Sequence, residues 1–163
     1  MKRILTILME NEPGALSRIV GLFSQRGYNI DSLCVAKTDD PTLSRLTVCT
    51  SGDEKSLEQI TKQVNKLIDV LRVNNITEQE HVERELMLVK VATPNSTIRA
   101  GIKSTADIFR AQIIDVCSDC YTVQMVGPPA RLKAFLQAVK DESNIIEVVR
   151  SGTVGLLRGK NAL

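Results

Sequence analysis

The sequence is poor in side chains that stack on bases and in side chains that commonly do acid–base chemistry. Its 163 residues include 3 Phe, 2 Tyr, no Trp and one His. An RNA-binding sheet needs aromatic residues on its middle strands, and the strand-like runs 3–9 and 43–50 contain none. A single histidine, His81, in a polar stretch cannot build a Ser-His-Asp or Cys-His arrangement. These absences argue against nucleic-acid binding and against catalysis.

A large charge imbalance and a long apolar segment are also missing. The 21 Lys and Arg nearly balance the 19 Asp and Glu, so nothing indicates a polyanionic partner. No uninterrupted apolar run reaches the roughly 18 residues of a membrane span. The apolar run in "MKRILTILMENEPG" is too short for a signal peptide. We therefore expect a cytoplasmic protein with no nucleic-acid partner and no membrane span.

Cysteine is scarce: the chain has Cys34, Cys49, Cys117 and Cys120. Only Cys117 and Cys120 have a C-x-x-C spacing, and zinc would need two further ligands at a suitable spacing. A thioredoxin-like motif should open a helix after a strand. The segment "CSDC" instead lies between two strand-like runs, which indicates a hairpin turn. We expect no metal and no cofactor in this chain, and a thiol or metal role for this pair is kept as an alternative.

The sequence does contain one order of elements written twice. In the first half, periodicity and end signals predict strands at 3–9, 29–37, 43–50 and 68–73, and helices at 14–27 and from the capping box Ser51-x-x-Glu54 onward. After the polar stretch 74–83 they predict strands at 85–92, 111–116, 121–126 and 144–150, and helices at 95–109 and 128–139. The order β-α-β-β-α-β is that of the split βαβ, or ferredoxin-like, arrangement.

These patterns predict an α+β protein with two ferredoxin-like domains in tandem. The expected division is residues 1–76, a linker at 77–84, and residues 85–163, whose tail shows no clear period. Strand 3–9 is apolar on both faces. Because two helices cover only one face of such a sheet, we expect a dimer partner or the sister domain to cover the other. One continuous domain with a larger sheet is the alternative.

The first predicted helix begins in an unusual way, at Asn11-Glu12-Pro13-Gly14. A glycine in the first turn weakens a helix unless something must approach the backbone. Free N–H groups at a helix start bind anions such as a carboxylate, and Asn11 can offer a donor and an acceptor to a zwitterionic amino acid. The motif therefore indicates amino-acid sensing. In the alternative reading, Asn11 is an ordinary N-cap and Gly14 a loop residue.

The segment "NEPGALSRIVGLFSQRGYNIDSLCV" resembles the ACT domain, a small-molecule-sensing module whose members commonly bind amino acids. The segments "RGYNIDSL", "TDDPTLSRLTV", "DVLRV" and "HVERELMLVKV" closely resemble the family of regulatory small subunits of acetolactate synthase, also called acetohydroxyacid synthase. The resemblance continues through "FRAQIIDV", "YTVQMVG" and "VVRSGTVGLLRG". It covers nearly the whole chain.

This resemblance implies a non-catalytic regulatory subunit in the biosynthesis of valine, isoleucine and leucine. Its implied partner is a catalytic large subunit, which carries thiamine diphosphate, magnesium and FAD. The small subunit of this family activates that partner and makes it sensitive to feedback inhibition, most often by valine. A stand-alone ACT-domain amino-acid sensor with a different partner is the alternative.

The resemblance also implies where the effector binds. Two ACT domains pair side by side, so the chain is expected to form a homodimer with the effector at the interface. One chain supplies the loop before the first helix, which corresponds to Asn11, Gly14, Ala15 and Leu16. The other supplies the start of the second strand, Asn29 and Ile30. A difference of one methylene is worth only about 1–3 kcal/mol in an apolar pocket, so the choice among branched-chain amino acids stays open.

Overall fold

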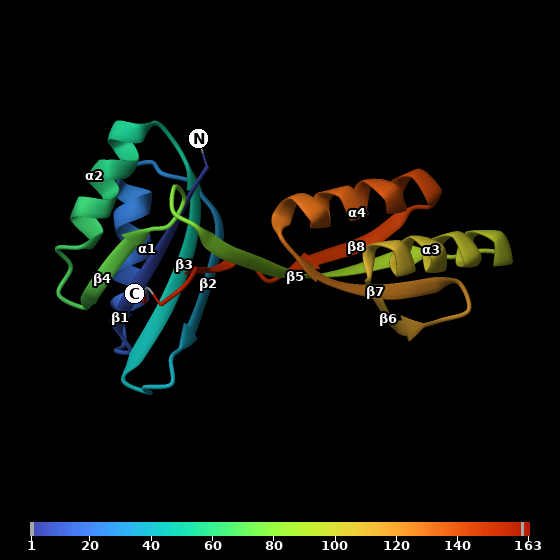
Figure 1. The fold of residues 1–163 in the computed structure, drawn as a ribbon, viewed down its shortest axis with the longest axis horizontal. Helices are drawn as coiled ribbons and strands as arrows, with labels where there is room; N and C mark the ends of the chain where they lie inside the picture. The colour runs from blue at the N-terminus through green and yellow to red at the C-terminus, as the bar shows by residue number, and fades with distance from the viewer. Residues whose placement is uncertain (1, 161) are drawn as a thin grey trace. The chain divides into compact units, whose positions relative to one another are not determined.

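A computed structural model describes residues 2–160 and 162–163 of the chain and divides the chain into two compact units. Unit 1 comprises residues 1–83 and 153–163, and unit 2 comprises residues 84–152. Each unit contains an antiparallel sheet with two helices on one face (Figure 1). The two separate sheets confirm the predicted pair of ferredoxin-like domains.

Unit 1 follows the predicted order of elements. These are β1 (Lys2–Glu10), α1 (Ala15–Gln25), β2 (Ile30–Lys37), β3 (Leu43–Ser51), α2 (Glu54–Val64) and β4 (Val70–Asn75). The sheet order is β2-β3-β1-β4, so β2 and β4 are the edge strands. Phe23 of α1 and Ile60 of α2 are buried against Ile7 of β1. Each such side chain contributes about 1.5–3 kcal/mol through burial.

The ends of the unit 1 helices follow local chemistry. Gly27 has a φ of 70°, and Tyr28 N donates to Phe23 O at 3.0 Å, which is the left-handed helix stop that glycine favours. The predicted capping box at Ser51 is wrong. The N-cap of α2 is Asp53, whose carboxylate accepts from Ser56 N at 2.9 Å.

Unit 2 repeats the same order. Its elements are β5 (His81–Ala92), which begins in unit 1, α3 (Ser96–Phe109), β6 (Gln112–Val116), β7 (Cys120–Gly127), α4 (Pro129–Glu142) and β8 (Ile145–Arg150). The sheet order is β6-β7-β5-β8. Met87 and Val89 of β5 are buried with Ile102 of α3 and Phe135 of α4. Asn95 caps α3 by accepting from Ile98 N at 2.9 Å.

The division of the chain differs from the expected one at two places. Residues 81–84 are part of the continuous strand β5 and not of a polar linker. Residues 153–163, which we call the C-terminal segment, belong to unit 1 and not to the second domain. This segment contains a short strand, β9 (Val154–Leu157), which pairs with β5.

The C-terminal segment covers part of the second face of the unit 1 sheet. Leu157 forms a separate buried cluster with Ile4, Cys49 and Ile76, and Arg45 Nη2 donates to Gly155 O at 3.1 Å. We expected a partner or the sister domain to cover this face. Instead, the C-terminal segment covers part of this face, because packing Leu157 against Ile4 removes apolar surface of both side chains from water.

The segment around Cys117 and Cys120 is a hairpin turn, as predicted. Cys117 N donates to Cys120 O at 2.9 Å, and both thiols are free. The hydrogen bond with Cys117, followed by burial, raises the pKa of the Cys120 thiol, which lowers the thiolate fraction that redox or metal chemistry needs. In the described part of the chain, no group of three or more His, Cys, Asp or Glu is arranged to hold a metal ion.

None of the helices within residues 2–160 and 162–163 combines the length and the apolar character that crossing a bilayer requires.

Candidate functional site

The loop between β1 and α1 is tied to the turn between β2 and β3 through Asn11. Asn11 N donates to Thr42 O at 2.7 Å, and Asn11 Nδ2 donates to Pro41 O at 3.1 Å. The Asn11 side-chain oxygen accepts from Ser44 Oγ at 3.1 Å. Asn11 is therefore not the N-cap of α1. Its side chain joins two loops at one end of the sheet.

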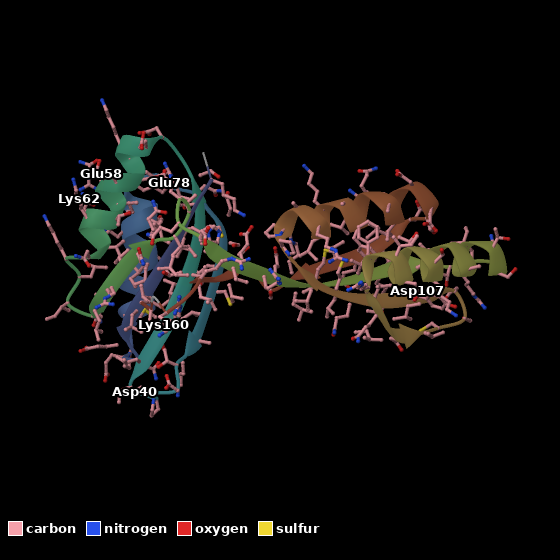
Figure 2. All side chains as sticks on the ribbon, viewed as in Figure 1. Asp40, Glu58, Lys62, Glu78, Asp107 and Lys160 are labelled. Carbon is pink, nitrogen blue, oxygen red and sulfur yellow. The ribbon has the colours of Figure 1, made fainter. Side chains whose placement is uncertain are left out.

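The β2–β3 turn that receives Asn11 has its own internal hydrogen bonds. Asp40, which Figure 2 labels in the β2–β3 turn, accepts from Thr42 Oγ1 at 2.7 Å and from Thr42 N at 2.9 Å. These bonds lower the pKa of the Asp40 carboxyl, the side-chain bond contributing most. The turn that holds Asn11 is thus fixed by an ionised carboxylate at neutral pH.

Gly14 is the N-cap of α1 and supplies no capping side chain. Its φ of 87° lies in the left-handed region, which favours glycine. Ala15 N donates to Glu12 O at 3.2 Å. No backbone carbonyl among the described residues accepts from the next two amides, Leu16 N and Ser17 N. The helix therefore begins with amide groups that can bind an anion.

An ion pair holds the first turn of α1 against the start of β4. Arg18 Nε lies 2.5 Å from Asp69 Oδ2, and Arg18 Nη2 lies 2.8 Å from Asp69 Oδ1. Asp69 is buried, and Glu10 N donates to its backbone oxygen at 2.8 Å. The hydrogen bond from Arg18 lowers the pKa of Asp69 and raises that of Arg18. This pair fixes the orientation of the helix start relative to β1.

An open pocket of about 280 Å³ lies beside this loop. Its lining residues come from β1, the loop, α1, β2 and β3: Met9, Glu10, Asn11, Glu12, Leu16, Val35, Ala36, Lys37 and Ser44. Leu16 and Val35 provide apolar surface, Lys37 a positive charge, and the two glutamates negative charge. This combination suits a small zwitterion with an apolar side chain.

The sequence predicted two of these lining residues, Asn11 and Leu16, as part of the site. It did not predict the lining residues of β2, which are Val35, Ala36 and Lys37. Of the other two loop residues expected here, Gly14 forms the helix start beside the pocket, while the side chain of Ala15 is buried in the core. Val35 and Lys37 reach the pocket because β2 pairs with β3 in a register that sets Lys37 opposite Ser44. The predicted strands at 29–37 and 43–50 are close enough in sequence to form this hairpin, so the sequence did contain a signal for the residues of β2.

The second expected group, Asn29 and Ile30, lies at the other end of β2. Ile30 is opposite Thr50, whereas Lys37 is opposite Ser44. The stretch of β3 between those two positions spans about 20 Å at roughly 3.4 Å per residue. Asn29 Nδ2 donates to Asp31 Oδ1 at 2.7 Å. Within one chain, the structure therefore does not bring the two expected groups together.

Two protein-family models match the chain, one in each half. The model described as "AHAS small subunit-like ACT domain" matches residues 5–72, and the model described as "Small subunit of acetolactate synthase" matches residues 84–159. The acetolactate synthase isozyme 3 small subunit of Escherichia coli (strain K12) is 59% identical over 159 residues, covering 98% of this chain and 97% of that protein. The acetolactate synthase small subunit of Haemophilus influenzae is 56% identical over 164 residues, covering 100% of each chain.

A solved structure agrees with these sequence comparisons. The crystal structure of the acetolactate synthase small subunit from Thermotoga maritima matches with a TM-score of 0.87 and 32% sequence identity. The match covers 99% of each chain. Both units and the order of their elements are therefore shared with that protein.

Proposed function

The chain belongs to the family of acetolactate synthase small subunits, and on this premise we propose that it activates a catalytic large subunit and makes it sensitive to feedback inhibition by valine. The chain is a regulatory subunit with an ACT domain. In this proposal the large subunit carries the thiamine diphosphate, magnesium and FAD of the reaction, in the cytoplasm. The small subunit contributes the effector site and no cofactor.

The observation that carries the proposal is a pocket beside an uncapped helix start. α2 and α3 each have a side-chain cap, whereas α1 and α4 have none. α4 begins at Pro129, which has no N–H to donate, so α1 offers more free amides at its start. The carboxylate of an amino acid fits the free amides of Leu16 and Ser17, where the helix dipole also favours negative charge. Glu10 and Glu12 offer carboxylates to the ammonium group, and Leu16 and Val35 offer apolar surface to a branched side chain.

The position of β2 at the edge of the sheet supports a site shared by two chains. An edge strand has unpaired N–H and C=O groups that can extend the sheet onto another copy. An antiparallel pairing of β2 with β2 of a second copy sets the end of one strand beside the start of the other. Asn29 and Ile30 of the second copy then lie next to Lys37 and the pocket. We propose that the effector binds there.

A mixing experiment tests the shared site. Asn11→Ala and Asn29→Ala are prepared as separate chains, each of which should bind valine weakly in a calorimetric titration. After subunit exchange, a mixed dimer contains one site with both asparagines and one with neither. We expect high-affinity binding to return in the mixture at a fraction of the wild-type stoichiometry. A mixture that binds no better than either variant would mean that both residues act within one chain, or that neither contacts valine.

Activation of the large subunit is tested separately from effector binding. The chain is titrated into purified catalytic subunit, with and without valine, leucine or isoleucine. We expect a rise in acetolactate formation that valine reverses. The alternative of a stand-alone sensor with another partner predicts no co-purification with the large subunit. The match of residues 84–159 to the small-subunit family favours the first reading.

A further inference from the structure

The turn between β6 and β7 carries two cysteine thiols that the proposed function does not use. Figure 1 shows the two strands joined by this turn. Cys117 N donates to Cys120 O at 2.9 Å, and the next pair along the hairpin is Val116 with Tyr121. Cys117 and Cys120 are therefore the last opposed pair before the turn. The side chains of an opposed pair lie on the same face of a sheet, so the two thiols are neighbours.

The spacing of this pair is compatible with a disulfide. Directly opposed residues that share a backbone hydrogen bond have Cα atoms about 5.5 Å apart, within the range of roughly 4.4–6.8 Å found in disulfides. Their Cβ atoms are about 4.5–5.5 Å apart, whereas a disulfide needs about 3.5–4.5 Å. The two strands must therefore approach each other by about 1 Å at the turn. The thiols of Cys117 and Cys120 are in contact through a hydrogen bond before any such movement.

The other two cysteines provide an internal comparison. Cys34 of β2 is opposite Thr47, and Cys49 of β3 is opposite Ser32. Cys34 and Cys49 are therefore diagonal neighbours, at a separation of about 7–8 Å, which is beyond the reach of a disulfide. Cys49 is also buried. Among the four cysteines, all of which the structure describes, the pair at the β6–β7 turn combines mutual contact with exposure.

We propose that Cys117 and Cys120 form a reversible disulfide when the chain meets a low-molecular-weight disulfide such as oxidised glutathione. The thiolate of Cys117 attacks one sulfur of that disulfide, and the S–S bond breaks as a first glutathione leaves and takes up the proton that Cys117 lost. Cys120 then loses its proton, attacks Sγ of Cys117 and displaces the second glutathione, which takes up that proton. Two cysteine thiols are oxidised, and one glutathione disulfide is reduced to two thiols.

The surroundings of the two sulfurs decide which one attacks. Cys117 is exposed, and Cys120 is half-buried. The hydrogen bond with Cys117, followed by burial, raises the pKa of the Cys120 thiol, so Cys120 is seldom a thiolate at neutral pH. Cys117 therefore attacks the incoming disulfide. Cys120 lies beside Cys117 and resolves the mixed disulfide.

The turn is tied to the rest of unit 2, which opposes its movement. Thr93 N, just after the end of β5, donates to Asp119 O at 2.7 Å, and Asp119 lies between the two cysteines. Closing the disulfide has to move a turn that this bond holds, so the closed form is strained. Strained and exposed disulfides are reduced more easily than structural ones. We therefore expect the pair to be open under the reducing conditions of a cytoplasm and to close under oxidising conditions.

Thiol trapping on the full-length chain tests the proposal. The chain is equilibrated with glutathione at a series of ratios of reduced to oxidised form, quenched with acid, alkylated with N-ethylmaleimide in denaturant and cut with trypsin. Cys117 and Cys120 lie in one tryptic peptide, residues 111–131, whereas Cys34 and Cys49 lie in two others. We expect peptide 111–131 to lose both alkylation sites together, with the loss of two hydrogens in mass, at ratios where Cys34 and Cys49 stay alkylated. Accumulation of glutathione on Cys117 or Cys120 without closure would overturn the proposal.

Single serine variants test the order of attack. Cys120→Ser should accumulate a mixed disulfide of Cys117 with glutathione, because no thiol is left to resolve it. Cys117→Ser should acquire glutathione more slowly, at Cys120. Cys34→Ser is the matched control and should close its disulfide as the wild type does. Equal rates of glutathione addition to the first two variants would overturn the assigned roles. Circular dichroism of each variant confirms that it is folded.

Discussion

Gly14 has a backbone conformation that other residues adopt only at a cost. Its φ is 87°, and the left-handed region costs a residue with a Cβ about 1–2 kcal/mol. A Cβ at this position would also lie 2.9 Å from Arg18 Nη1. Asp69 holds that guanidinium in place through two hydrogen bonds. A side chain at position 14 therefore disturbs both the loop and the ion pair beneath it.

We predict that comparing Gly14→Ala with Gly14→Glu distinguishes the effect of backbone strain on valine binding from the effect of an added negative charge. Both should lower the melting temperature, by about 2–4 °C for each kcal/mol lost in a chain of this size. Only Gly14→Glu adds a negative charge near the helix start, where we propose that the effector's carboxylate binds. Calorimetric titration with valine should show weaker binding by Gly14→Glu than by Gly14→Ala. Equal affinities would mean that backbone strain alone explains the effect.

The ion pair between Arg18 and Asp69 should make stability depend on acid pH. Because Arg18 lowers the pKa of Asp69, the stabilisation is fully present above the usual carboxyl pKa of about 3.9. It is lost as pH falls through the lower, folded-state value. We predict that Asp69→Asn is less stable than the wild type in urea at neutral pH. The difference in the free energy of unfolding between the two proteins should decrease below about pH 4. A difference that stays constant would contradict a stabilising ion pair between Arg18 and Asp69.

The candidate site shows which residues a linear pattern can identify. Asn11 and Leu16 lie in or beside the loop motif that signalled a helix start, and both line the pocket. Lys37 and Val35 line it only because a hairpin brings β2 back to that end of the sheet. The loop motif placed Ala15 in the site, but its side chain is buried in the core. The position of a residue around the helix axis decides which way its side chain points, and the loop motif does not specify which side of α1 faces the core.

At the scale of elements, the C-terminal segment acts as part of the unit 1 core. Leu157 is 9% exposed and packs in a cluster with Ile4 and Ile76, whereas Leu156 is 55% exposed. We predict that Leu157→Ala lowers the free energy of unfolding by about 2–3 kcal/mol, through lost burial and a cavity. Leu156→Ala should change it by less than about 0.5 kcal/mol. Urea unfolding of both variants measures the difference, and equal losses would exclude the cluster as a source of stability.

Most of the helices and strands could be predicted because each has a strong local period. β1, α1, β2, β3, α2 and β4 all lie within a few residues of their predicted positions. β9 is a strand of 4 residues that contains a glycine, too short to show a period. Its partners are distant in sequence, so only the folded chain reveals that Gly155 lies beside Arg45. The element that was missed is the one defined by tertiary contacts alone.

At the scale of the whole molecule, we predict that the chain is at least a dimer in solution. Sedimentation equilibrium at micromolar concentration should give at least twice the chain mass of 18.0 kDa. The physical reason is that β2 has an unpaired edge and lies beside the open pocket that we propose as the effector site. A particle of one chain mass, with and without valine, would contradict both the shared site and the pairing of β2.

The fold class could be predicted from the repeated order of elements, but the boundary between the units could not. A polar stretch at 74–83 has the composition of a linker. In the structure Ile76 is buried, and β5 runs without interruption from residue 81 to residue 92. Composition reports how polar a segment is, whereas a boundary depends on which residues contact one another.

The discontinuity of unit 1 has a consequence for how the chain is made on the ribosome. Residues 2–83 emerge first, but the segment that covers Ile4, Cys49 and Ile76 is translated only after all of unit 2. At about 5–20 residues per second, that interval lasts roughly 4–14 s. Unit 2 is complete before unit 1, which reverses the usual N-terminal-first order of domain folding. During this interval Ile4, Cys49 and Ile76 lack the cover that Leu157 gives them in the folded chain, and we predict that chaperones that bind exposed apolar surfaces bind the nascent domain.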